Sequence, residues 1–132
     1  MNTETTTYAI TRDVDAPFAE TVERVTAALA AEGFGVLSTI DVQATLKAKL
    51  DLDVEPYVIL GACNPTLASQ GLATEPDLGV LLPCNVVVRA AEERTHVAAM
   101  EPMAALALAG NPELEPLAAE AADRIRRAVS AL

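Results

Sequence analysis

Aromatic residues are scarce in this sequence: there are two tyrosines, two phenylalanines and no tryptophan among 132 residues, although 52% of the residues are hydrophobic. A core built from this composition consists mainly of leucine, valine, isoleucine and alanine side chains in close layers. The length suffices for one continuous core but not for two, so we expect a single domain over residues 1–132.

Basic residues are also few, since nine lysines and arginines stand against 19 acidic residues and the net charge is -10. Lys47 and Lys49 are the only lysines. This balance lacks the basic patch on which nonspecific binding to a phosphate backbone depends, so we expect no nucleic-acid partner. The acidic excess is spread along the chain, as is typical of a surface that favours solubility.

Long hydrophobic runs are absent as well. The longest nearly apolar run, over 78–88, has eleven residues and contains Pro83 and Asn85, whereas a helix that spans a membrane needs about 20. The first eight residues are polar and rich in threonine, without the charged start and apolar stretch of a signal peptide. We therefore expect a cytoplasmic protein without a membrane segment, in which Cys63 and Cys84 stay reduced.

The periodicity of apolar residues predicts both strands and helices in the first half of the chain. Apolar residues recur at helical spacing from Phe18 to Leu29, and Gly33 is placed to end that helix. Asp41 and Asn64 are residues that favour the N-cap of a helix, and a proline follows Asn64 directly. The expected elements are strands over 8–14, 34–40 and 57–63, and helices from 18 to Gly33, over 42–50 and over 65–74.

The second half continues this α+β order. Val86, Val87 and Val88 lie in a β-branched run over 84–90, which predicts a central strand covered on both faces, with an apolar approach over 78–82. A polar turn and a returning strand over 96–100 complete a hairpin. A short helix over about 103–109 and a terminal helix follow, and the buried positions of the terminal helix are Leu117, Ala121, Ile125 and Val129.

The two cysteines share a local motif. Cys63-Asn64-Pro65 and Pro83-Cys84-Asn85 each place an asparagine after a cysteine and beside a proline, at the end of an expected strand. If Asn64 is an N-cap, the thiol of Cys63 lies just before a helix N-terminus, where the helix dipole favours the thiolate. If a neighbouring strand brings Cys84 near, two soft thiolates suit Zn or Cu(I), or a dithiol/disulfide pair.

Several short motifs stand out along nearly the whole chain. They are Gly33-Phe34-Gly35-Val36-Leu37, Ile40-Asp41-Val42-Gln43-Ala44-Thr45-Leu46-Lys47, Gly61-Ala62-Cys63-Asn64-Pro65, Leu81-Leu82-Pro83-Cys84-Asn85-Val86-Val87-Val88, Pro102-Met103 and Gly110-Asn111-Pro112-Glu113-Leu114. With these motifs the chain resembles the domain of unknown function 302 family, in its cysteine-bearing branch. The resemblance implies a TATA-box-binding-protein-like fold, in which an antiparallel sheet of about five strands is backed by helices, and no biochemical activity is established for the family.

Three functions are compatible with these residues. The first is a small-ligand or soft-metal-ion binding module, as a homodimer, in which Cys63 and Cys84 bind the metal and Asn64, Asn85 and Asp41 bind a ligand. The second is a thiol enzyme or redox sensor in which Cys63 is the nucleophile and Cys84 resolves it. The third is a structural or interaction domain whose cysteines are inert core residues.

Each candidate residue also has a structural explanation. Cysteine is among the residue types most often buried, and Asn64 and Asp41 are explained as helix caps. His96, the only histidine, could act as a base or as a third metal ligand. It is explained equally as a solvated residue near a turn, because the sequence pairs it with no orienting group.

Overall fold

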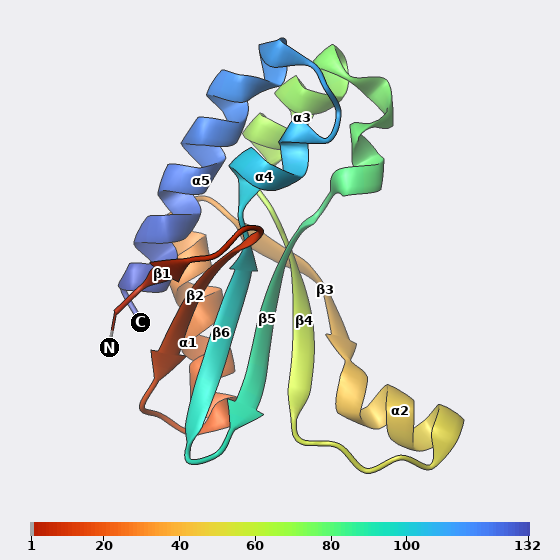
Figure 1. Ribbon diagram of the computed structural model, residues 1–132, viewed down its shortest axis with the longest axis vertical. Helices are drawn as coiled ribbons and strands as arrows, with labels where there is room; N and C mark the ends of the chain where they lie inside the picture. Colours follow the sequence, from red (N-terminus) through yellow and green to blue (C-terminus); the bar gives the residue numbers. More distant parts are fainter. Residues whose placement is uncertain (1) are drawn as a thin grey trace.

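Six strands form a single antiparallel sheet in the computed structural model, which describes residues 2–132. Their order across the sheet is β1-β2-β6-β5-β4-β3 (Figure 1). Neighbouring strands are antiparallel throughout. The strands are β1 (Glu4–Thr5), β2 (Ala9–Val14), β3 (Gly35–Asp41), β4 (Tyr57–Cys63), β5 (Cys84–Ala91) and β6 (Arg94–Met100).

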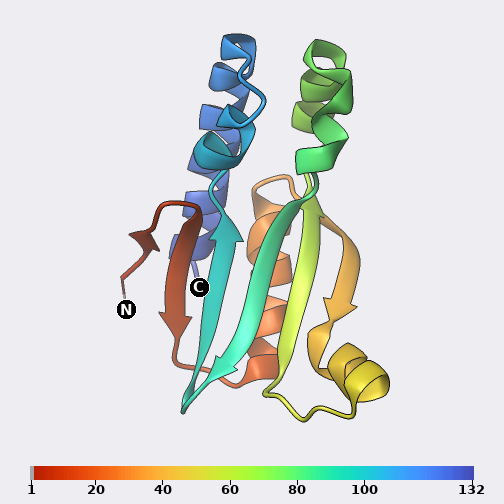
Figure 2. The same cartoon turned by 45° about the vertical axis from the view of Figure 1, so that its right-hand side comes forward.

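Helices cover one face of this sheet and extend beyond one of its ends (Figures 1 and 2). The helix α1 packs on β3, β5 and β6, and α5 packs on β2, β6 and α1. The helices are α1 (Phe18–Ala31), α2 (Val42–Leu50), α3 (Pro65–Thr74), α4 (Pro102–Ala107) and α5 (Glu115–Ser130), with short 3-10 helices η1 (Pro76–Leu81) and η2 (Pro112–Leu114).

The core lies between the covered face of the sheet and the helices α1 and α5. Alternate residues of the central strands enter it, as the period of a strand requires. A second, smaller cluster joins η1, α4, η2 and α5 beyond the end of the sheet. Side chains buried in the main core include Ile10, Val14, Val25, Leu29, Leu60, Val86, Val88, Val97 and Ile125, and the second cluster contains Leu78, Leu106, Leu114 and Ala118.

The structure confirms the α+β class and most of the expected elements. The strand over 57–63 and the helix over 65–74 have the predicted bounds. The side chains of Asp41 and Asn64 accept the backbone N–H groups of Ala44 and Leu67, as expected of N-caps. Gly33 follows α1 with φ of 85°, a conformation that glycine adopts without strain.

Three features differ from the sequence-based expectation. The strand β1 has two residues that pair back on β2, and so short a segment carries no periodicity. The approach before β5 is the 3-10 helix η1. The strand β5 is central, but its two faces are not equally covered: Val86 and Val88 are buried, whereas Val87 is half-buried on the face without helices. A run of valines therefore does not require two covered faces.

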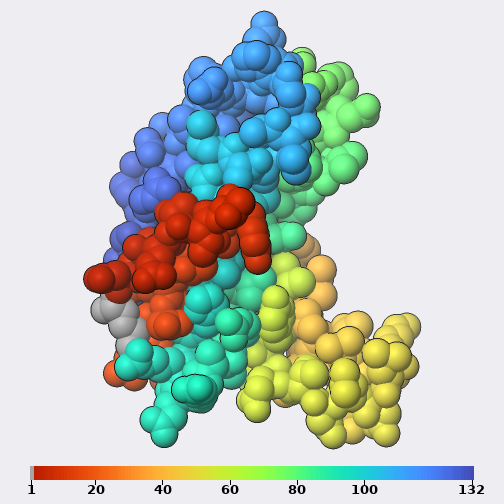
Figure 3. Space-filling model, viewed as in Figure 1, coloured from red at the N-terminus to blue at the C-terminus, as the bar shows by residue number. Residues whose placement is uncertain are grey.

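The helix α2 stands apart from the rest of the fold. None of its residues is buried, and it projects from the side of the sheet after the edge strand β3 (Figures 1 and 3). Among residues 2–132, no helix has the length and apolar character needed to cross a membrane.

Truncation of Ile125 tests the main core. Ile125 is fully buried in α5, so Ile125→Ala removes apolar contacts and leaves a cavity that costs about 2–5 kcal/mol of unfolding free energy. Val80→Ala is the control, because Val80 is 86% exposed and its truncation changes stability by no more than about 0.5 kcal/mol. Urea unfolding measures both variants, and an equal effect would contradict this core.

Candidate functional site

The fold brings the two cysteines to neighbouring strands. Cys63 is the last residue of β4 and Cys84 is the first residue of β5. In the register of these strands, Cys84 lies opposite Ala62, the residue before Cys63. Both cysteines border a hollow of about 30 Å³ that is otherwise lined mainly by apolar side chains. The expected meeting of Cys63 and Cys84 at one end of the sheet is thus present.

The environment of Cys84 favours an inert thiol. Cys84 is 8% exposed and belongs to the main core. Burial raises the pKa of this thiol to about 11, and the nearby Cys63 contributes in the same direction. Because a thiolate is the reactive form and the metal-binding form, this shift opposes both uses of Cys84.

The relative direction of the two thiols also matters. Cys63 is half-buried and follows Ala62, the partner of Cys84, by one position. Successive side chains of a strand point to opposite faces, whereas directly opposed residues of two strands share a face. The register therefore does not give Cys63 and Cys84 the converging Cβ directions that a disulfide requires.

Asn64 lies where α3 begins, near the end of α1 and near Arg124 of α5. It is 8% exposed, and its Oδ1 accepts the backbone N–H of Leu67 at 3.0 Å, which caps α3. The side chain also lies against the turn after α1, because a Cβ on Gly33 would come within 2.9 Å of the Asn64 amide nitrogen and 3.2 Å of an Arg124 nitrogen. Arg124, from α5, donates to the backbone oxygen of Glu32 at 3.3 Å.

Asn85 and Asp41 do not join the cysteines. Asn85 is exposed on the face of the sheet opposite Cys84, since adjacent residues of β5 alternate in direction. Asp41 lies at the other end of β3, where it pairs with Val58 and caps α2. In the part of the chain that the structure describes, no group of three or more His, Cys, Asp or Glu side chains is arranged to hold a metal ion. Within the described residues, the two thiols thus lack the further protein ligands that a tetrahedral zinc site needs.

A row of four polar or aromatic side chains crosses the uncovered face of the sheet. Tyr57 of β4 lies opposite Arg89 of β5, and Arg89 lies opposite His96 of β6. His96 in turn lies opposite Asp13 of β2. Directly opposed residues in antiparallel strands have neighbouring side chains on one face, so this row brings together residues that are far apart in the sequence.

The structure gives His96 the orienting partner that the sequence did not indicate. The Nδ1 atom of His96 is 2.7 Å from Oδ1 of Asp13, and the two side chains are 23% and 49% exposed. This bond occupies Nδ1, so Nε2 is the nitrogen that a bound molecule can meet. Only the pairing of β2 with β6 joins the two residues, and no local sequence signal marks it.

Apolar residues occupy the neighbouring row on the same face. Ile59, Val87 and Ala98 are directly opposed in β4, β5 and β6. Val87 and Ala98 of this row, Tyr57, Arg89 and His96 of the polar row, and residues from the α4 region and the loop before β2 line a hollow of about 910 Å³. Figure 3 shows this face, with the N-terminal segment crossing its upper part. Other lining residues are Glu4, Thr6, Thr7, Tyr8, Ala9, Thr11, Asn85, Ala99, Met100, Ala104, Ala105 and Leu108.

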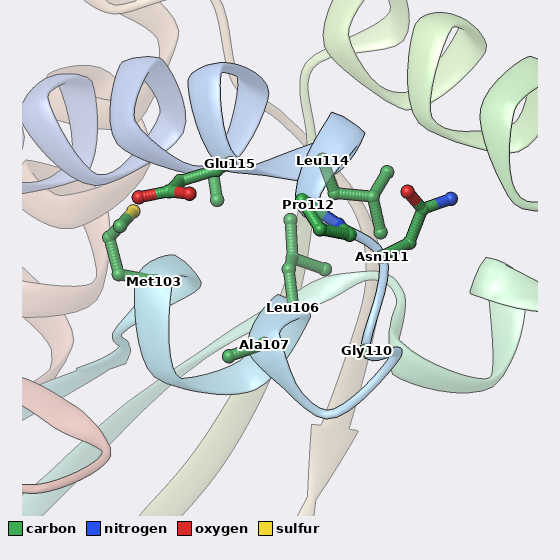
Figure 4. A pocket seen from close by; sticks show the side chains of 9 residues that line it. Met103, Leu106, Ala107, Gly110, Asn111, Pro112, Leu114 and Glu115 are labelled. Carbon is green, nitrogen blue, oxygen red and sulfur yellow. The ribbon is translucent and has the colours of Figure 1, made fainter.

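A second hollow, of about 440 Å³, lies between α4 and the start of α5. In Figure 4, Leu106, Pro112 and Leu114 surround its middle, and the side chains of Met103 and Glu115 approach each other at one side. Its asparagine, Asn111, already accepts the backbone N–H of Glu113 at 3.0 Å. This hollow thus has fewer polar groups available to a ligand than the hollow on the sheet face.

These features define a class of small α+β domain, with an antiparallel sheet, helices on one face only and a cysteine pair where β4 meets β5. The chain belongs to the family described as "Domain of unknown function DUF302", whose model matches residues 10–132. A solved structure of an uncharacterized conserved DUF302 protein from Bacillus stearothermophilus is 33% identical, with a TM-score of 0.86 over 92% of this chain and 95% of that chain. No curated protein matches the sequence. The resemblance noted from the motifs is confirmed.

Substitution of Asn64 tests how much its cap of α3 contributes to stability. Asn64→Ala leaves the first turn of α3 without its side-chain acceptor and lowers the unfolding free energy by about 1–2 kcal/mol. Asn64→Ser keeps a capping oxygen and loses less stability. Urea unfolding compares the two variants, and equal stability of Asn64→Ala and the wild type would exclude a capping role.

Thiol labelling tests the environment of Cys84. In a Cys63→Ser variant, Cys84 is the only thiol, and burial, the main cause of its raised pKa in the wild type, still lowers its thiolate fraction at pH 8. We expect native labelling by a disulfide reagent to be at least about tenfold slower than in urea, and to accelerate as the pH rises. Rapid labelling of the native variant at pH 8 would show that the thiol is not sealed.

Proposed function

We propose that the protein is a small-molecule binding module whose ligand occupies the hollow on the uncovered face of the sheet. The observation that carries this proposal is the hollow itself, of about 910 Å³, a size typical of sites for small molecules. Its lining combines apolar side chains with a few polar groups contributed by several strands, which is the usual composition of such sites.

The position of the hollow supports the same conclusion. Its central residues come from β4, β5 and β6, which form the inner part of the sheet and are held by the core on the opposite face. A site on such strands is rigid, so a ligand loses less free energy to ordering of the protein. Asn85, one of the residues expected to bind a ligand, lines this hollow.

The cysteine pair supports a function less well. A soft metal ion would have only two thiol ligands, which suits a two-coordinate ion such as Cu(I). One of these ligands, Cys84, resists the deprotonation that metal binding requires. A thiol enzyme would depend on Cys63 without a resolving partner that faces it. We therefore assign the cysteines and Asn64 to the junction of the core clusters, and we place the protein in the cytoplasm, where both thiols stay reduced.

An uncharged fluorescent probe tests the hollow. N-phenyl-1-naphthylamine brightens in apolar sites, and we expect the native protein to bind it saturably at one site per chain. Ala98→Trp places a large ring at the β6 end of the apolar row, inside the hollow, and is expected to weaken binding at least about tenfold. Ala44→Trp is the matched control, because Ala44 is exposed on α2.

Two results would contradict the proposal. In the first, the native protein does not bind the probe. In the second, Ala98→Trp and Ala44→Trp bind it equally, which would place the probe elsewhere.

The expected homodimer stays a prediction, which sedimentation with and without the probe examines. A dimer that forms through the uncovered face excludes the probe, whereas a dimer that forms through the edge strand β3 leaves the hollow open.

A further inference from the structure

We infer that the ligand of this hollow is an amphipathic monocarboxylate whose carboxylate binds Arg89, an inference that rests on the proposed function. Arg89 is the only arginine or lysine that lines the hollow. In a chain with a net charge of -10, a single cation in a hollow whose one acidic lining residue is Glu4 is the feature that most directly selects a ligand by charge.

Arg89 has no acidic partner within the part of the chain that the structure describes. The ion pairs there join Arg24, Lys47, His96, Arg124 and Arg127 to acidic side chains, and Arg89 is in none of them. It is nevertheless half-buried. A guanidinium that has lost part of its hydration gains most from an anion that accepts two parallel hydrogen bonds.

The neighbours of Arg89 leave room for one negative charge. Tyr57 and His96 flank Arg89 in the polar row. The Tyr57 hydroxyl can donate a hydrogen bond to an anion, whereas His96, whose Nδ1–H faces Asp13, can donate from Nε2 only as the imidazolium. Asp13 lies two strands from Arg89, at a separation of about 10 Å, and its Oδ1 is bonded to His96. Glu4, the acidic residue that lines the hollow, lies on β1, three strands from Arg89. Because no second lysine or arginine lines the hollow, a carboxylate fits better than a doubly charged phosphate.

The rest of the hollow suits an apolar chain or ring. From His96 to Met100 the strand β6 advances four residues, about 13 Å along the sheet. Along this path the lining changes from the polar row to Val87 and Ala98 and then to Met100 and Asn85, with Leu108 of the α4 region beyond. Leu108 is 78% exposed, and an apolar tail would cover it. Apart from Asn85 and the threonines of the N-terminal segment, the site is thus polar at one end and apolar at the other.

Displacement of N-phenyl-1-naphthylamine by octanoate and by octanol tests this inference, because the two differ only in the charged head group. In the wild type we expect octanoate to displace the probe at a concentration about tenfold lower than octanol. In Arg89→Gln that advantage disappears, while displacement by octanol is unchanged. Arg94→Gln, at an exposed arginine of the β5–β6 turn, keeps the advantage.

The outcomes separate the two proposals. If the probe binds and octanol displaces it as well as octanoate does in the wild type, recognition of a carboxylate is wrong and the hollow remains a binding site. If Arg94→Gln loses the advantage as Arg89→Gln does, the preference is one of general surface charge and the assignment to Arg89 is wrong. If the probe does not bind, both proposals fail. The comparison of octanoate with octanol in the wild type tests carboxylate recognition without any variant, so the test does not depend on whether Arg89→Gln folds.

Discussion

The one-sided coverage of the sheet is the constraint on which the rest of the structure depends. The helices α1 and α5 bury alternate residues of β2, β5 and β6 on one face, and this burial supplies the main favourable term in folding. The residues in between are then held in place without taking part in the core. Every feature of the uncovered face, from the Asp13–His96 pair to Arg89, has its position set by packing on the other face.

The end of the sheet where β4 and β5 meet has a different role. There the main core adjoins the smaller cluster of η1, α4 and α5, and Cys63, Asn64 and Cys84 lie at the contact between them. A small apolar side chain and an amide whose oxygen caps α3 fit such a contact, because it offers little free volume and few polar partners. The close approach at Gly61, where a Cβ would collide with Ser38 and Pro83, reflects the same tight packing.

Local signals account for what the sequence predicts well. The strand β4 and the helix α3 have the expected bounds because Asn64 and Pro65 together specify where a strand ends and a helix begins. Register is not a local property, so neither the row of Tyr57, Arg89, His96 and Asp13 nor the separation of Asn85 from Cys84 is evident without the paired strands. Asn85 follows Cys84 by one residue, and that single step moves it to the other face.

The alternation in β5 and β6 divides the chain into two sets of residues that selection can change independently. Val86, Val88 and Val97 maintain folding, while Val87, Arg89 and His96 face outward. A replacement in the outward set changes the chemistry of the uncovered face with little loss of stability, since the opposite set still holds the strands together. The two faces of these strands can thus vary separately without a change in the backbone.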